Sequence, residues 1–174
     1  MNIQGKRITL RPIAMSDLPC CTRWAADMEI MKHVGGRTFT PKEEREWLEG
    51  VLRNPKEHIF AILKEDGSHI GMCGLHMEST NSAIRNEPGL SIGMLIGEKS
   101  EWGKGYAGEV MTLLAHHAHE AYGAKRVWLT VDVNHERAIR AYEKAGFRIH
   151  RKFQDTDRKV ADGFQYVMEK NFET

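Results

Sequence analysis

The sequence predicts one α/β (α+β) domain, built on a single mixed sheet of about seven strands flanked by about four helices. Strand-like and helix-like runs alternate as strand, two helices, three strands, helix, strand, helix and two strands. Residues 58–64 and 69–77 are joined by a turn containing Asp66-Gly67, which favours an antiparallel hairpin. Strand 90–96, a long helix and strand 127–133 form a crossover, which predicts one parallel pair.

The N-terminal part predicts a strand followed by two helices. Residues 7–11 alternate in polarity and end at Pro12. Ser16 or Asp17 can cap the first helix, whose buried stripe is expected to contain Leu18, Cys21, Ala25 and Met28. The second helix has Thr40, Pro41 and Glu43 as N-cap, first residue and capping-box partner. Its core side is expected to be Trp47, Leu48, Val51 and Leu52.

The C-terminal part predicts two helices and three strands. The helix that ends at Gly123 is expected to bury Ala107, Met111, Leu114, Ala118 and Ala121. After strand 127–133, Asn134 is expected to cap a short helix that runs to Ala145. Residues 147–154 and 164–170 follow as two strands.

Composition describes a single domain over residues 1–174, with 41% hydrophobic and 28% charged residues. The net charge of +1, with basic and acidic residues interspersed, does not indicate a nucleic-acid partner. There is no signal peptide and no apolar run of transmembrane length, so no membrane partner is expected. Three cysteines without metal-ligand spacing indicate a reducing, cytoplasmic setting. A monomer or a homodimer is expected.

The apolar strand 90–96 leads into a glycine-rich turn and then a helix, which is an arrangement that binds phosphate groups. Without a β-carbon, Gly103, Gly105 and Gly108 let the backbone turn tightly and bring several amides near one anion. The following helix N-terminus adds about half a positive charge. These features suit a pyrophosphate.

A dinucleotide could also fit this turn, because Gly103, Gly105 and Gly108 match the Gly-x-Gly-x-x-Gly fingerprint and Asp132 could bind a ribose. However, too few residues follow Asp132 to complete a doubly wound sheet. A P-loop is excluded because no Gly-Lys-Ser/Thr ends the run.

The turn Trp102-Gly103-Lys104-Gly105-Tyr106-Ala107 resembles the acyl-CoA turn of the Gcn5-related N-acetyltransferases (GNAT), Gln/Arg-x-x-Gly-x-Gly/Ala. Trp102 replaces the polar first residue, which looks like the branch that includes ribosomal-protein alanine N-acetyltransferases. A second resemblance follows at Asn134, Ala138, Ile139, Tyr142, Gly146 and Phe147. The two motifs occur in the family's order, and the predicted elements follow the order of the GNAT fold over nearly the whole chain.

The resemblance implies an acetyl-CoA-dependent N-acetyltransferase whose parallel strands splay apart around the acyl-CoA. No metal is expected, and His116, His117 and His119 are interpreted as a solvated helix face. The residues implied to bind the donor are Met94, Leu95, Ile96, Trp102, Gly103, Lys104, Gly105, Tyr106, Ala107, Gly108, Asn134, Ala138 and Tyr142. The amide of Leu95 or its neighbour is the implied donor to the thioester oxygen.

Tyr142 is implied to be the general acid that protonates the CoA sulfur. Many relatives carry a glutamate base on the central strand where this chain has Ser91. Glu87 is the substitute predicted here beside Ser91, and His76 and Asp132 are the other candidates.

The acceptor pocket is expected to use the loops 33–39, 78–87 and 155–162. Because an α-amine is neutral more often than a lysine amine at pH 7, the missing glutamate favours a protein or peptide N-terminus as acceptor. A small-molecule amine, such as a polyamine or aminoglycoside, is the alternative. A non-catalytic acyl-CoA-binding sensor is a second alternative.

Overall fold

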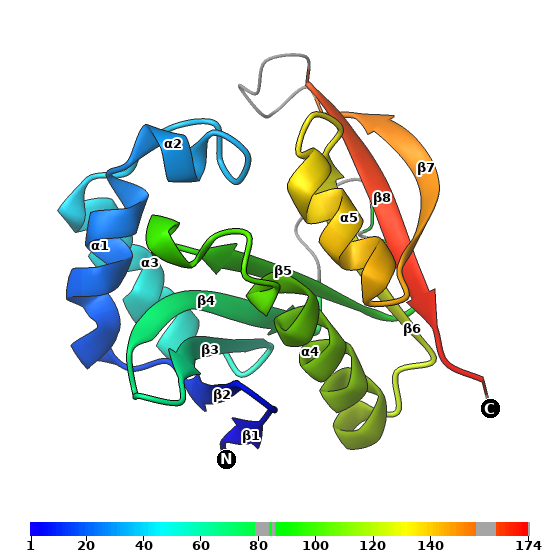
Figure 1. Ribbon diagram of the computed structural model, residues 1–174, viewed down its shortest axis with the longest axis horizontal. Helices are drawn as coiled ribbons and strands as arrows, with labels where there is room; N and C mark the ends of the chain where they lie inside the picture. Colours follow the sequence, from blue (N-terminus) through cyan, green and yellow to red (C-terminus); the bar gives the residue numbers. More distant parts are fainter. Residues whose placement is uncertain (79–83, 85, 156–162, 174) are drawn as a thin grey trace.

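The computed structural model describes residues 1–78, 84, 86–155 and 163–173. Within these residues one sheet holds eight strands in the order β1-β2-β3-β4-β5-β6-β8-β7 (Figure 1). All neighbouring strands pair antiparallel except β5 and β6, which pair parallel. The strands are β1 (Ile3–Gln4), β2 (Ile8–Pro12), β3 (Glu57–Lys64), β4 (His69–His76), β5 (Leu90–Ile96), β6 (Arg126–Asp132), β7 (Arg148–Gln154) and β8 (Phe164–Asn171). The predicted mixed sheet is therefore confirmed, with the two-residue edge strand β1 added.

Five α-helices occur in the described residues: α1 (Leu18–Ala25), α2 (Met28–Met31), α3 (Pro41–Arg53), α4 (Tyr106–Tyr122) and α5 (Glu136–Lys144). Two 3₁₀ turns, η1 (Met15–Asp17) and η2 (Lys99–Glu101), precede α1 and the glycine-rich turn. The prediction of one unbroken first helix through Met28 is wrong. Asp27 interrupts it, because its side chain accepts a hydrogen bond from the amide of Glu29 at 2.9 Å and caps α2.

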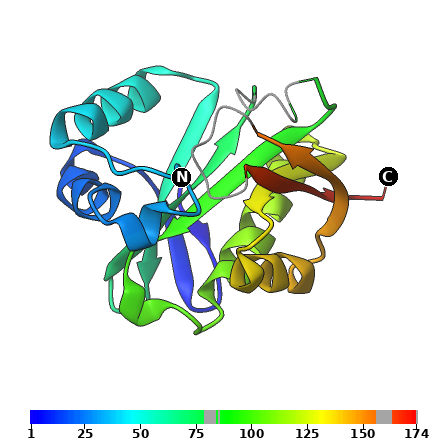
Figure 2. The same ribbon diagram turned by 90° about the horizontal axis from the view of Figure 1, so that it is seen from above.

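The sheet has a hydrophobic core on each face. On one face, α4 packs Val110, Met111 and Leu114 against the inner strands. On the other face, Cys21 of α1 and Leu48 of α3 pack with Ile59 of β3. Helices α1–α3 lie toward one end of the molecule and α5, β7 and β8 toward the other (Figure 2).

Some predicted core residues are on the surface. Trp47 is 39% exposed and Leu52 is 45% exposed, because the buried face of α3 runs through Glu44 and Leu48, one helical turn apart. Ala121 is exposed at the end of α4. The capping box of Thr40 and Glu43 is confirmed, with Thr40 accepting from the Glu43 amide at 3.2 Å.

The parallel pair is short. Only Leu90 with Val127 and Ser91 with Trp128 are paired, although β5 continues to Ile96 and β6 to Asp132. The two strands therefore diverge after Ser91, which divides the sheet into a block of β1–β5 and a block of β6–β8 (Figure 1).

Candidate active site

A cleft of about 1350 Å³ lies where β5 and β6 diverge. Its walls include the second half of β5, the middle of β6, the first turn of α4 and the inner side of α5. Ser91 and twelve of the thirteen predicted donor-binding residues line this cleft. The twelve are Met94, Leu95, Ile96, Trp102, Gly103, Gly105, Tyr106, Ala107, Gly108, Asn134, Ala138 and Tyr142. Segments distant in the sequence are thus brought together.

The glycines of the turn serve different purposes. Gly103 and Gly105 have φ of 77° and 84°, in the left-handed region that residues with a β-carbon rarely adopt. Gly105 is the N-cap of α4, so the free amides at the start of this 17-residue helix open toward the cleft. Gly108 is helical, and a β-carbon there would lie 3.5 Å from the carbonyl oxygen of Ala141, an ordinary contact distance, so the space between α4 and α5 does not require glycine.

Trp102 ties the turn to its surroundings. Its indole Nε1 donates to the carbonyl oxygen of Ile96 at 2.8 Å, so the turn folds back onto the end of β5. The guanidinium of Arg137 on α5 lies over the Trp102 ring, 4.2 Å from its centroid. An aromatic residue at this position therefore joins the turn to both walls of the cleft.

Lys104 is the one predicted donor-binding residue outside the cleft lining. Its ammonium group pairs with Glu101 at 3.1 Å, while its carbonyl oxygen accepts from Arg7 at 2.9 Å. Arg7 also pairs with Glu109 at 2.9 Å, and its guanidinium lies 4.6 Å from the centroid of Tyr106. Sequence reasoning missed Arg7 and Glu109, because their partnership depends on β2 lying next to the start of α4.

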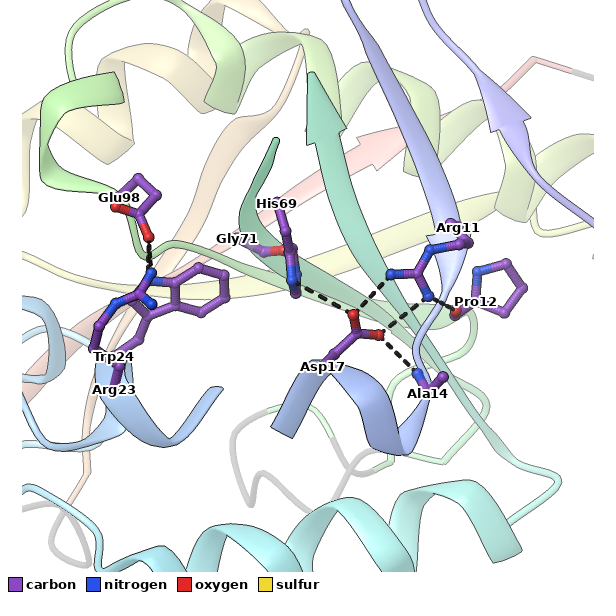
Figure 3. Close-up of polar contacts among 9 residues, drawn as sticks. All are labelled: Arg11, Pro12, Ala14, Asp17, Arg23, Trp24, His69, Gly71 and Glu98. Carbon is purple, nitrogen blue, oxygen red and sulfur yellow. Dashed lines mark hydrogen bonds and ion pairs between the residues drawn. The ribbon is translucent and has the colours of Figure 1, made fainter. Parts of the chain in front are cut away.

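Helix α1 holds the segment before the turn (Figure 3). The indole of Trp24 donates to Glu98 at 3.0 Å, and Arg23 pairs with the same carboxylate. Gly97 permits this contact, because a β-carbon there would lie 2.1 Å from the Trp24 ring. On its other side the Trp24 ring meets His69 edge-on at 4.9 Å.

The base of α1 is fixed by Asp17, which is buried between Arg11 and His69 (Figure 3). Its carboxylate accepts from Arg11 at 2.7 Å and from the Ala14 amide at 2.9 Å. Burial alone would raise the pKa of Asp17, but these hydrogen bonds and the charge of Arg11 lower it overall. The carboxylate is therefore ionised at neutral pH and anchors α1 beside the turn.

On α5, Tyr142 lines the cleft and packs against the core, and burial raises the pKa of its phenol to about 12. The phenol therefore keeps its proton at neutral pH and can donate it. The prediction that Asn134 caps α5 is wrong, since the helix begins at Glu136 after the cap residue His135. Instead, the backbone amide of Asn134 donates to Oδ1 of Asp132 at 2.8 Å, which tightens the turn between β6 and α5.

The candidate bases lie in different places. Ser91 is buried at the meeting point of the cleft and a smaller pocket of about 560 Å³. Glu87 lines only the smaller pocket, where Arg151 lies 3.6 Å from its carboxylate. His76 lines the cleft and pairs with Glu57, whereas Asp132 faces His33 at 3.3 Å. Of the predicted acceptor loops, 79–83, 85 and 156–162 lie outside the described residues.

Two stacked histidines form part of the cleft wall near α2. His33 and His135 lie with ring centroids 4.1 Å apart, and both line the cleft. Burial, with the neighbouring His33, lowers the pKa of His135 to about 4. His135 is therefore neutral at physiological pH.

The three histidines of α4 have aromatic neighbours instead of metal ligands. His119 stacks on Phe172 at 4.5 Å and its Nδ1 faces the Ala124 carbonyl oxygen at 3.0 Å. His116 also contacts Phe172, and His117 meets Phe60 edge-on. In the part of the chain that the structure describes, no three His, Cys, Asp or Glu side chains gather as a metal site, and no helix suits a membrane span.

The fold matches solved acetyltransferases. A GNAT-family acetyltransferase from Bacillus anthracis superposes with a TM-score of 0.83 over 98% of each chain, at 18% identity. A spermidine N-acetyltransferase from Vibrio cholerae, solved with CoA and spermine, gives 0.81 over 95% of each chain, at 17% identity. The fold is therefore that of the GNAT acetyltransferases.

The sequence comparisons identify the family. The family model of the acetyltransferase (GNAT) domain matches residues 7–148, and the chain belongs to this family. An uncharacterized N-acetyltransferase p20 from Bacillus licheniformis is 22% identical over 171 residues, covering 94% of this chain and 93% of that protein. The protein is thus an acetyl-CoA-dependent N-acetyltransferase, and the dinucleotide interpretation of Asp132 is wrong.

Proposed function

We propose that this enzyme transfers the acetyl group of acetyl-CoA to a protein or peptide N-terminal α-amine, as in the branch that includes ribosomal-protein alanine N-acetyltransferases. The observation that carries the acceptor class is Ser91 on the central strand, at the position where the family resemblance implies a glutamate base in many relatives. At an amine pKa of about 7.8, roughly one α-amine in seven is neutral at pH 7. For a lysine amine of pKa about 10.4 the fraction is roughly one in 2,500.

The proposed donor site is the divergence of β5 and β6. The turn amides and the N-terminus of α4 bind the pyrophosphate, and backbone groups of Met94, Leu95 and Ile96 hold the pantetheine arm. The Leu95 amide stabilises the oxyanion. The support is that these residues line one continuous cleft, with Asn134, Ala138 and Tyr142 on its opposite wall.

Tyr142 is the proposed general acid, and Ser91 with Glu87 is the base arrangement expected from the sequence. The protonated phenol in the cleft supports the first role. The role of Glu87 as base has weaker support, because Glu87 lies in the adjoining pocket, away from the donor-binding residues. The free cysteines Cys20, Cys21 and Cys73 suit the proposed cytoplasmic setting.

A small-molecule amine is the second candidate acceptor. It is favoured by Glu57 and Glu78, two carboxylates that line the cleft and pair with His76 and Lys56, and by the fold shared with a spermidine N-acetyltransferase. A polyamine carries several ammonium groups along its length, and carboxylates in the cleft would bind them.

The test is release of free CoA thiol with a panel of N-terminal peptides, a lysine side-chain amine, spermidine and an aminoglycoside. We expect the highest kcat/KM with an α-amine. Tyr142→Phe should lower kcat by about 10² to 10⁴-fold and leave the acetyl-CoA Kd unchanged. Faster turnover of spermidine would favour the small-molecule function, and acetyl-CoA binding without release for any acceptor would indicate a sensor.

A further inference from the structure

We propose that His76 is the general base of this enzyme and that Glu57 positions it. This inference rests on the proposed transfer to an amine and names the proton acceptor of that reaction. It replaces Glu87 in that role.

The two side chains are placed together by strand register. Glu57 is the first residue of β3 and His76 the last of β4, and the two are direct partners in the antiparallel ladder. The Nδ1 atom of His76 lies 2.5 Å from Oε2 of Glu57. On its other side His76 is the register partner of Ser91 on β5. All three residues line the cleft.

The ring lies over two glycines. Its Nε2 is 3.1 Å from the position that a β-carbon would occupy at Gly74, and 3.9 Å from that position at Gly93. Gly74 and Gly93 are themselves register partners. Because neither has a side chain, the imidazole can extend along the sheet with Nε2 toward β5, whose following residues form the proposed donor site. Among the described residues, Nε2 has no hydrogen-bond partner.

This geometry suits a neutral imidazole acting as a base. When Nδ1 carries the proton of the neutral ring and donates it to the Glu57 carboxylate, the available lone pair is on Nε2, which faces the open cleft. The carboxylate also stabilises the imidazolium that forms when Nε2 accepts a proton. Glu57 itself acts through the ring and is a positioning residue.

The carboxylates near the site are less suitable as the general base than His76. Glu87 lies in the smaller pocket near Arg151, and Glu78 pairs with Lys56 at 2.5 Å. Asp132 is buried beside His33. Among these candidates, His76 combines a position in the cleft with an unpaired lone pair.

The acceptor nitrogen loses two protons during the reaction. The acceptor ammonium gives one proton to Nε2, which later passes it to solvent. The amine nitrogen then forms a bond to the thioester carbon, the C–S bond breaks, and the nitrogen loses a second proton to water. Tyr142 gives a proton to the sulfur and regains one from water. The products are the acetamide, CoA thiol and one released proton.

The test compares two acceptors that differ in amine basicity. One peptide begins with alanine and the other with trifluoroalanine, whose fluorines lower the amine pKa so that most of it is neutral at pH 7. We expect His76→Gln to lower kcat/KM at pH 7 by up to about sevenfold for the alanine peptide, whose amine is neutral in about one molecule in seven, and to leave that for the trifluoroalanine peptide nearly unchanged. Acetyl-CoA Kd should be unchanged in both cases.

Glu57→Gln should show a smaller loss with the same dependence on amine basicity, and the double variant should be no worse than His76→Gln. His58→Gln is the matched control, because His58 follows Glu57 on β3 but contacts Tyr122 and does not line the cleft. It should retain wild-type kcat/KM.

Equal losses with both peptides at unchanged acetyl-CoA Kd would overturn the role of His76 as base. A weaker acetyl-CoA Kd with unchanged kcat would overturn it as well, by assigning His76 to the donor site. If the wild-type enzyme turns over neither peptide, the proposed acceptor class fails. If it turns over both and His76→Gln lowers both equally, only the base role fails. The wild-type measurement therefore separates the two failures.

Discussion

Glu44 is a buried carboxyl group far from the cleft, on the inner face of α3. It is 7% exposed, and burial raises its pKa to about 7. The folded state therefore holds a proton on Glu44 between about pH 4.5 and 7, where the unfolded chain has released it. Its contribution to stability is complete below pH 4.5 and is lost as the pH rises through about 7.

Glu44→Gln should therefore stabilise the protein in alkaline solution and change little in acid. The amide of glutamine cannot ionise, so the variant avoids the free-energy cost of a buried charge. The raised pKa of Glu44 corresponds to a cost of about 3 kcal/mol. Urea unfolding at pH 8.5 and at pH 4.5 measures the difference. Glu46→Gln, an exposed change on the same helix, is the control. An equal effect of Glu44→Gln at both pH values would contradict this account.

Trp102 shows what sequence comparison can and cannot predict about a single residue. The motif placed it correctly at the start of the turn, but its indole hydrogen bond to Ile96 and its contact with Arg137 depend on the tertiary structure. The same holds for Glu44, which reads as an ordinary helix glutamate. Residue identity predicted which residues form the turn, and packing determined their contacts.

At the scale of elements, some predictions based on local chemistry were confirmed, whereas the predicted Asn134 cap of α5 was wrong. Asp66-Gly67 predicted the β3–β4 hairpin, and Gly67 has φ of 81°. Predictions that depended on neighbours were less accurate. The exposure of Trp47 follows from how α3 meets the sheet. Periodicity alone does not contain that information.

Two glycines of similar geometry allow the turn to be tested. Gly103 and Gly123 have φ of 77° and 66°, and a β-carbon would meet no atom within 4 Å at either position. Alanine at either position should cost about 1 to 2 kcal/mol of stability through backbone strain. Only Gly103 lines the cleft, so only Gly103→Ala should weaken acetyl-CoA binding, by roughly tenfold, the equivalent of one charge-assisted hydrogen bond.

Titration calorimetry with acetyl-CoA, paired with urea unfolding, separates these two effects. Equal acetyl-CoA affinity in the two glycine variants would mean that the turn does not bind the donor.

At the scale of the whole molecule, the site exists only where two blocks of sheet diverge. The sequence predicted the parallel pair and the segments around it, and both are confirmed. It did not rank His76 above Glu87, because the contact between His76 and Glu57 joins residues 19 positions apart through strand register. A single-sequence pattern does not encode such a pairing.

Binding of the donor across this divergence should stabilise the entire fold. At 100 times its Kd, acetyl-CoA or CoA should add about 2.7 kcal/mol and raise the Tm by roughly 5 to 10 °C. NADH at the same concentration is the control ligand and should not shift the Tm. A thermal unfolding scan with each ligand makes the comparison, and a shift with NADH alone would contradict the donor assignment.

The N-terminal segment that contains α1 and α2 contacts a residue before the glycine-rich turn and also lines the cleft. Trp24 and Arg23 on α1 bind Glu98 just before the donor turn, whereas Ile30 and His33, a few residues later, line the cleft. Exchanging this segment to obtain a new acceptor would also move the support of the donor turn. If the turn binds the donor as proposed, substitutions within residues 15–39 should change the Michaelis constants of both substrates together.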